Sequence, residues 1–175
     1  MRENRALLRH ILLFAGIAAA LASCARARIA EDLTSDLESA RRQPADAVFD
    51  VVNAESDHGP MRCVRTHGAT RLTYHVTVPS GATLSVWTPA TASSASDAGV
   101  AYLVGLSDGH AYRTVTGDTT EPASESQTAQ WRNSRFRLDE YAGMTINVVF
   151  NTRSREPSTA PPGAGLWCSP AILVR

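Results

Sequence analysis

The residues best suited to chemistry in this chain are its three tryptophans and the polar side chains beside them. Each tryptophan borders a long connection between predicted strands, at 88–99, 118–130 or 152–165. An indole ring packs well against the apolar face of a sugar, and its N–H can donate to a hydroxyl group. Neighbouring amide and guanidinium groups would add fixed donors. One hypothesis is therefore a glycan-binding rim made of Trp87, Trp131, Trp167, Arg132, Asn133, Asn151 and Arg153.

A second interpretation of the same tryptophans is structural. Large aromatic side chains are mostly buried in folded proteins, and at strand ends they often close the end of a core. The three connections are rich in Ser, Thr and Ala rather than in aromatic contact residues. Both interpretations stay open from the sequence.

No catalytic or cofactor pattern accompanies these residues. The sequence lacks nucleophile motifs, zinc spacings and phosphate loops. Ser107, Asp108 and His110 are near neighbours in one predicted hairpin turn, so they cannot converge as a catalytic triad. We therefore expect no enzyme activity and no cofactor. A structural calcium ion would need acidic oxygens, but spacing singles out none of Asp97, Asp108, Asp118 and Asp139.

The first 23 residues have the pattern of a secretory signal. Three arginines precede an almost wholly apolar run at 11–21, which is shorter than the ~20 residues that a spanning helix needs. Leu21-Ala22-Ser23-Cys24 resembles the lipobox of bacterial lipoproteins. This resemblance implies cleavage before Cys24, a lipid such as palmitate on its sulfur, and attachment to a membrane of the cell envelope. Ala25 after the cysteine implies the outer membrane. The alternative is an ordinary signal peptide with an incidental Cys24.

The other two cysteines, Cys63 and Cys168, form an even pair in a chain expected to be exported. Exported compartments permit disulfides, and strand parity puts both cysteines at one end of the predicted domain. We expect a bridge between them, while two separately buried thiols remain the alternative.

The segment after the signal has a helical period. Ile29, Leu33 and Leu37 recur every four residues, and Pro44 would stop a helix. We expect residues 24–46 to be a lipid-anchored spacer containing a short amphipathic helix. A partner-docking helix is the alternative.

From residue 47 onward the period changes to two, which is typical of β-strands. Short strands separated by turns predict one antiparallel jelly-roll β-sandwich over residues 47–175. The predicted strands are 47–52, 61–65, 71–78, 83–87, 100–106, 111–116, 135–138, 145–151 and 171–174. Because such strands run alternately up and down, the short turns at 79–82, 107–110 and 139–143 share one end. The three long connections share the other end.

Three pieces of the predicted sandwich resemble the galactose-binding-like jelly roll and carbohydrate-binding modules. They are 71–84 (RLTYHVTVPSGATL), 131–152 (WRNSRFRLDEYAGMTINVVFNT) and 165–173 (GLWCSPAIL). The resemblance implies a β-sandwich whose loop end binds a glycan in many members. In other members the domain binds a protein or only stabilises a neighbouring domain.

The sequence thus predicts a lipid-anchored, non-catalytic module that binds an envelope or extracellular glycan. The alternative is an assembly lipoprotein that holds an envelope protein. Nucleic acid is not an expected partner, because the chain has no formal net charge and binding of nucleic acid needs a basic face.

Overall fold

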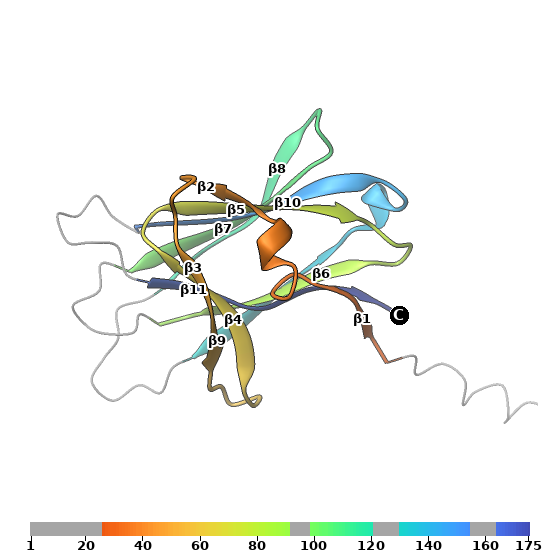
Figure 1. Ribbon diagram of the computed structural model, residues 1–175. Helices are drawn as coiled ribbons and strands as arrows, with labels where there is room; N and C mark the ends of the chain where they lie inside the picture. Colours follow the sequence, from red (N-terminus) through yellow and green to blue (C-terminus); the bar gives the residue numbers. More distant parts are fainter. Residues whose placement is uncertain (1–25, 92–98, 121–129, 155–163) are drawn as a thin grey trace, which may run out of the picture.

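The computed structural model describes residues 26–91, 99–120, 130–154 and 164–175, leaving aside the side chains of residues 118 and 119. Two sheets face each other, and two short 3-10 turns complete the fold (Figure 1). The elements are β1 (Arg28–Asp32), η1 (Leu37–Ser39), β2 (Arg41–Gln43), β3 (Phe49–Ala54), β4 (Met61–His67), β5 (Thr70–Thr77), β6 (Thr83–Pro89), β7 (Val100–Ser107), β8 (Tyr112–Thr119), β9 (Trp131–Arg137), η2 (Asp139–Tyr141), β10 (Thr145–Ser154) and β11 (Ala164–Val174).

Every strand pairing among the described residues is antiparallel, which confirms the predicted β-sandwich. Sheet A has the order β3-β4-β11-β6-β9, with β1 also paired to β11. Sheet B has the order β2-β5-β10-β7-β8. Each of the nine strands expected from the period-2 pattern overlaps an observed strand. The observed strands run longer, mainly where β9, β10 and β11 extend toward the long connections.

The largest departure from expectation is the N-terminal segment. The predicted helix is wrong, because β1 pairs with β11 and β2 with β5, so the segment adds a strand to each sheet. Asp32 favours a turn instead, since its carboxylate accepts the Thr34 N–H at 3.0 Å and the Ser35 hydroxyl at 2.8 Å. Side-chain bonds of this kind compete with helical backbone bonds. Within its described part, residues 26–46, the expected helical spacer belongs to the sandwich.

The leucine spacing that suggested a helix reflects burial at the edge of the core. Leu33 and Leu37 are 0% and 5% exposed, whereas Ile29 is 65% exposed. The Leu33 N–H also donates to the carbonyl of Pro170 at 3.0 Å. These leucines therefore pack internally, which overturns the alternative of a partner-docking helix.

The core lies between the sheets, where the period-2 pattern puts it. On β5 the alternating residues Leu72, Tyr74 and Val76 are buried, and His75 faces solvent. Sequestering such apolar side chains from water is the main favourable term in folding. The same alternation leaves each sheet with an outer face, and both outer faces carry residues that the sequence analysis singled out.

Strand register confirms the expected difference between the two ends. Pro89 lies opposite Trp131 and Val100 opposite Ser154, so the strand ends that flank the long connections meet at one end, the long-loop end. Thr77 lies opposite Thr145 at the other end, the short-turn end. In Figure 1 the two ends lie on opposite sides of the sandwich.

Candidate functional site

Trp167 lies inside the core, not on a rim. It is 1% exposed, and its ring meets Tyr102 edge-on at 5.0 Å and Phe150 at 4.8 Å between centroids. Tyr102 is fixed in turn, because its hydroxyl accepts the Leu166 N–H at 3.0 Å. Burial also raises the pKa of Tyr102 to about 12. Trp167 therefore fills the core, in agreement with the structural interpretation, and cannot touch a ligand.

Trp87 and Trp131 lie on the outer face of sheet A, beside a disulfide. Cys63 and Cys168 are cross-strand partners on β4 and β11 and are bonded, with their Cα atoms 3.9 Å apart. This confirms the predicted bridge and excludes two free thiols. The bridge, Met61 and the two tryptophans form one apolar cluster, together with Val52, Ala54 and Leu166. We call this surface the disulfide face.

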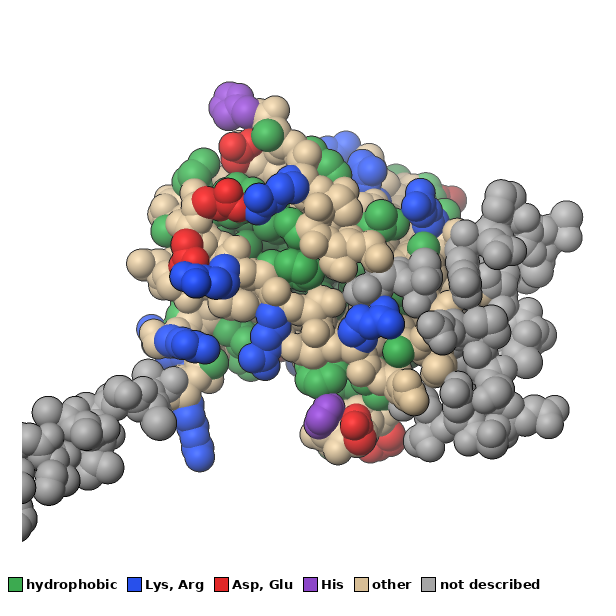
Figure 2. Space-filling view, turned by 180° about the vertical axis from the view of Figure 1, so that it is seen from behind, with side chains coloured by type: hydrophobic (Ala, Val, Ile, Leu, Met, Phe, Trp, Pro, Cys, Tyr) green, Lys and Arg blue, Asp and Glu red, His purple; other side chains and the backbone are tan. Residues whose placement is uncertain are grey.

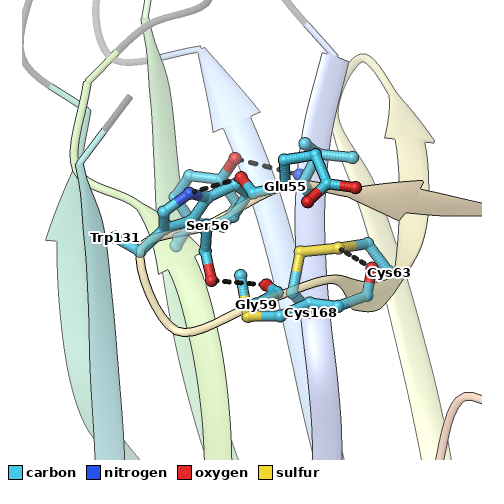
Figure 3. Close-up of a disulfide and its surroundings, with 9 residues drawn as sticks. Glu55, Ser56, Gly59, Cys63, Trp131 and Cys168 are labelled. Atoms are coloured by element: carbon cyan, nitrogen blue, oxygen red, sulfur yellow. Dashed lines mark hydrogen bonds between the residues drawn. A yellow bond between two sulfur atoms is a disulfide. The ribbon is translucent and has the colours of Figure 1, made fainter. Parts of the chain in front are cut away.

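The connection between β3 and β4 folds over the disulfide face. The Trp131 indole N–H donates to the carbonyl of Glu55 at 3.2 Å (Figure 3). The His58 ring lies 4.9 Å from the Trp87 ring. The Ser56 hydroxyl ties the connection together by donating to the Gly59 carbonyl at 2.7 Å. The two tryptophans thus hold the connection between β3 and β4 in place. These contacts occupy the surface that a ligand would need.

The neighbouring polar residues of β9 are also engaged within sheet A. Asn133 donates to the Ser85 hydroxyl at 3.1 Å and accepts the Arg135 Nε–H at 2.8 Å. Arg132 lies opposite Thr88 and is half-buried. The predicted rim is therefore divided, because its remaining members, Asn151 and Arg153, lie on the other sheet.

Asn151 and Arg153 line a groove on the outer face of sheet B. The groove has a volume of about 480 Å³ and is open to solvent. Its floor is a row of directly opposed residues from four strands, Gln43, Arg71, Asn151 and Leu103. Gly117 continues the row on β8. Pro44, Ala69, Thr70, Thr152 and Arg153 line the side nearest the long-loop end.

A chain of hydrogen bonds orders this row. Arg71 donates from Nε to Asn151 Oδ1 at 2.8 Å, and Asn151 Nδ2 donates to the Tyr112 hydroxyl at 3.4 Å. Tyr112 is 52% exposed and lies against the backbone of Gly105, where any Cβ would collide with its ring. The groove therefore offers a fixed guanidinium and a fixed amide, and the exposed Tyr112 ring lies beside it, joined through Asn151.

The sequence analysis missed most of these residues. It named Asn151 and Arg153 but not Gln43, Arg71, Leu103 or Tyr112, which converge only through register. One usable signal was present, because Gly105 inside a strand is typical of a close approach to the backbone. Another was the outward position of Arg71 in an alternating strand.

A second, slightly smaller depression of about 430 Å³ lies between the edge strands β8 and β9. It is lined by Arg113, Arg135 and Arg137 around Phe136. Two of these arginines face acids, since Arg113 pairs with Glu140 and Arg137 Nε donates to Asp139 at 2.7 Å. Figure 2 shows one side of the molecule on which arginine side chains touch acidic ones.

Of the four aspartates considered for calcium, the two that are fully described are engaged within the chain, Asp108 by backbone N–H groups and Asp139 by Arg137. Asp108 accepts the backbone N–H groups of His110 and Ala111, bonds that lower the pKa of its carboxyl. Asp97 and the Asp118 side chain lie outside the described residues, as does Cys24. Within the described ranges, no three His, Cys, Asp or Glu side chains gather as metal ligands would. No helix in these ranges has the length and apolar character needed to cross a membrane.

Comparison with known proteins identifies the fold. No protein-family model matches the chain, and no curated protein matches it. Solved structures do. A family 61 carbohydrate-binding module in complex with β-1,4-galactotriose superposes with a TM-score of 0.52 and 17% identity, covering 79% of this chain and 90% of the module. This chain has the β-sandwich fold of carbohydrate-binding modules.

Two family 22 modules show the same fold. The C-terminal module of Clostridium thermocellum Xyn10B gives a TM-score of 0.50 at 13% identity, covering 83% of this chain and 93% of the module. The xylan-binding module of Paenibacillus barcinonensis Xyn10C gives 0.50 at 11% identity, covering 82% and 97%. The resemblance read from the sequence is confirmed at the level of the fold.

Proposed function

We propose that this protein is a lipid-anchored, non-catalytic module that binds a glycan in the groove of sheet B. The observation that carries the proposal is the ordered set Arg71, Asn151 and Tyr112 on an open, preformed surface. Such a site combines apolar contact with a few fixed polar groups, as ligand sites generally do. The solved modules of the same fold include one in complex with β-1,4-galactotriose and one described as xylan-binding, which supports this class of ligand.

The chemistry of the groove suits sugars. The exposed Tyr112 ring can pack against the apolar face of a pyranose, while Arg71, Asn151 and Gln43 exchange hydrogen bonds with ring hydroxyls. Carboxylate pairs, which glycoside hydrolysis requires, do not occur among the described residues that line the groove. These features support binding without turnover.

The groove also refines the predicted position of the ligand. The expected rim lay on the long connections themselves. The groove instead lies on a sheet face and reaches the long-loop end through Ala69, Thr70 and Arg153. Asn151 and Arg153 keep their proposed role as ligand contacts, and the tryptophans lose it.

The described part of the chain begins at the opposite end of the sandwich, and this supports a proposed anchor near that end. Arg28 lies opposite Val174, where β1 begins at the short-turn end. Three residues separate Cys24 from Arg28, and a chain spans at most about 3.6 Å per residue. A lipid on Cys24 would therefore hold the short-turn end close to the membrane. The long-loop end, which the groove reaches, would then lie away from the bilayer, toward envelope or extracellular glycans, and we propose the outer membrane as the location.

A glycan array with full-length protein in detergent tests the binding function. We expect the wild type to bind at least one glycan class. The R71A/N151A double variant should lose that signal. The R135A/N133A variant, which removes the matching Arg–Asn pair on sheet A, should keep it. A wild type that binds no glycan on the array would overturn the proposed function.

Metabolic labelling tests the anchor separately. Cells that express the protein are grown with radiolabelled palmitate, and C24S serves as the control. We expect label in the wild type and none in C24S. An unlabelled wild type would contradict the anchor and leave the glycan proposal standing.

One observation favours the alternative, a lipoprotein that holds a protein partner. Val48 and Val51 are 63% and 44% exposed, one just before β3 and one within it, and β3 is an edge strand of sheet A. An open edge can accept a strand from another chain. Co-purification of a stoichiometric protein that is lost in V51R, together with an empty glycan array, would favour this alternative.

A further inference from the structure

The strands of sheet B have an unusual charge balance. They carry the five arginines Arg41, Arg42, Arg71, Arg113 and Arg153, and a single acidic residue, Asp118. The whole chain, by contrast, has 17 basic and 17 acidic residues. The excess of positive charge is therefore a property of this sheet and not of the protein.

Three of these arginines lie on the outer face of sheet B. Arg41, Arg71 and Arg153 are exposed, and they project to the same side as the groove because each shares the outward register with Gln43 or Asn151. His75 is exposed on the same face. Two of the three arginines, Arg71 and Arg153, line the groove itself.

The charges of these three arginines are not neutralised by the described part of the chain. None has a carboxylate within salt-bridge distance there. Five other described arginines, two of them also on sheet B, each lie within salt-bridge distance of an acid. The pairs are Arg42 with Glu38, Arg62 with Asp32, Arg65 with Asp50, Arg113 with Glu140 and Arg137 with Asp139.

The geometry of Arg71 suits an anionic ligand. Its Nε is held by Asn151 Oδ1 at 2.8 Å, which fixes the plane of the guanidinium and leaves its terminal N–H groups for a ligand. A planar guanidinium matches a carboxylate with two parallel hydrogen bonds. Fixing it in advance reduces the entropy lost on binding. No described residue that lines the groove would repel a negative charge.

We propose that the groove selects glycans that carry anionic substituents, carboxylates as in uronic acids or sulfates, through Arg71 and Arg153. This inference rests on the proposed function and narrows its ligand class. A neutral glycan would leave two cationic groups without counter-charges. An acidic glycan satisfies both and places its rings beside Tyr112.

The test compares one backbone with and without its charge. Polygalacturonate and its fully methyl-esterified form are titrated into full-length protein in detergent, and binding is measured by calorimetry at low and at 0.5 M salt. We expect the acid to bind at least about tenfold more tightly than the ester, because hydrogen bonds to charged groups are worth roughly that factor or more. The advantage should shrink at high salt. Dextran sulfate against dextran serves as the sulfate arm.

Charge-matched variants locate the effect. R71Q/R153Q should lose the preference for acid over ester, whereas R62Q/R135Q removes the same charge from sheet A and should keep it. If both variants lose the preference for acid over ester equally, or if double-stranded DNA binds as tightly as polygalacturonate, the effect is a general attraction to polyanions. Either result would overturn the inference. If the ester or a neutral galactan binds as well as the acid, the charge inference fails and glycan binding stands. If no glycan binds, the proposed function itself fails.

Discussion

The two outer faces of the sandwich carry similar side chains in opposite settings. Each has an arginine Nε that donates to an asparagine Oδ1 at 2.8 Å, Arg135 to Asn133 on sheet A and Arg71 to Asn151 on sheet B. On sheet A the aromatic side chains are held against the disulfide and the protein's own connection at 55–60. On sheet B the aromatic ring is exposed and a groove remains open.

This difference shows that residue type alone does not mark a binding site. Tryptophans are the strongest sugar-binding signal in the sequence, yet here they are used for internal packing. A less conspicuous tyrosine, set against a glycine, supplies the exposed ring. We propose that sheet A contributes stability and that sheet B contributes recognition, and the following changes separate these roles.

Removal of the disulfide should produce the largest effect on stability. In the chain-entropy model, a bridge across a sequence separation of 105 residues stabilises the fold by about 4–5 kcal/mol. We expect C63A/C168A to lose most of that free energy of unfolding in urea denaturation. Its glycan affinity should stay unchanged where it is folded. A stable double variant with weakened binding would reverse the assignment of roles.

Replacing Trp167 should destabilise the fold more than replacing Trp131. W167A removes a fully buried ring and should cost about 3–5 kcal/mol. W131A removes a half-buried ring and one hydrogen bond, for which we expect about 1–2 kcal/mol. Thermal unfolding followed by circular dichroism gives both values. Loss of glycan binding in folded W131A would place recognition on the disulfide face after all.

Gly105 and Gly117 provide a matched pair on the groove sheet. A Cβ at Gly105 collides with the Tyr112 ring, so G105A must move that ring away from Asn151. We expect binding about three- to tenfold weaker, equivalent to one hydrogen bond. At Gly117 a Cβ would meet only Leu103 Cδ2, at 3.8 Å, and G117A should bind normally. Isothermal titration with both variants checks this, and equal affinities would remove Tyr112 from the site.

The smallest effect concerns pH and the disulfide face. A hydrogen bond from Arg65 holds the pKa of the Asp50 carboxyl below its usual range. A lowered folded-state pKa adds stability above the unfolded pKa of about 4, and this stability is lost as pH falls through the folded value. D50N should therefore flatten the decline of stability below about pH 4. Urea midpoints across this range measure it, and a decline as steep as in the wild type would refute it.

Local patterns predicted most of the fold. The alternation on β5 identified its buried face, and strand parity brought Cys63 and Cys168 to the same end. The prediction of a helix in the N-terminal segment failed because Leu33 and Leu37 share a helical spacing by chance, while the Asp32 turn decides the local structure. Short-range spacing cannot distinguish a helix from two leucines that enter the core from a turn.

The site was much less predictable than the fold. Gln43, Arg71, Asn151 and Leu103 are far apart in the sequence and become neighbours only because β2, β5, β10 and β7 are adjacent in sheet B. Nothing local in the sequence specifies that order. The tryptophans misled because the residues that engage Trp87 and Trp131 are also distant in the sequence. They belong to the connection at 55–60, which precedes both tryptophans in the chain.

The most direct test of the central claim is an NMR titration of the uniformly labelled protein with a glycan that binds on the array. We predict the largest amide shifts at residues 71, 103, 112, 151 and 153, with little change at 58, 87, 131 and 133. Shifts concentrated on the second set would place the ligand on the disulfide face and contradict the account.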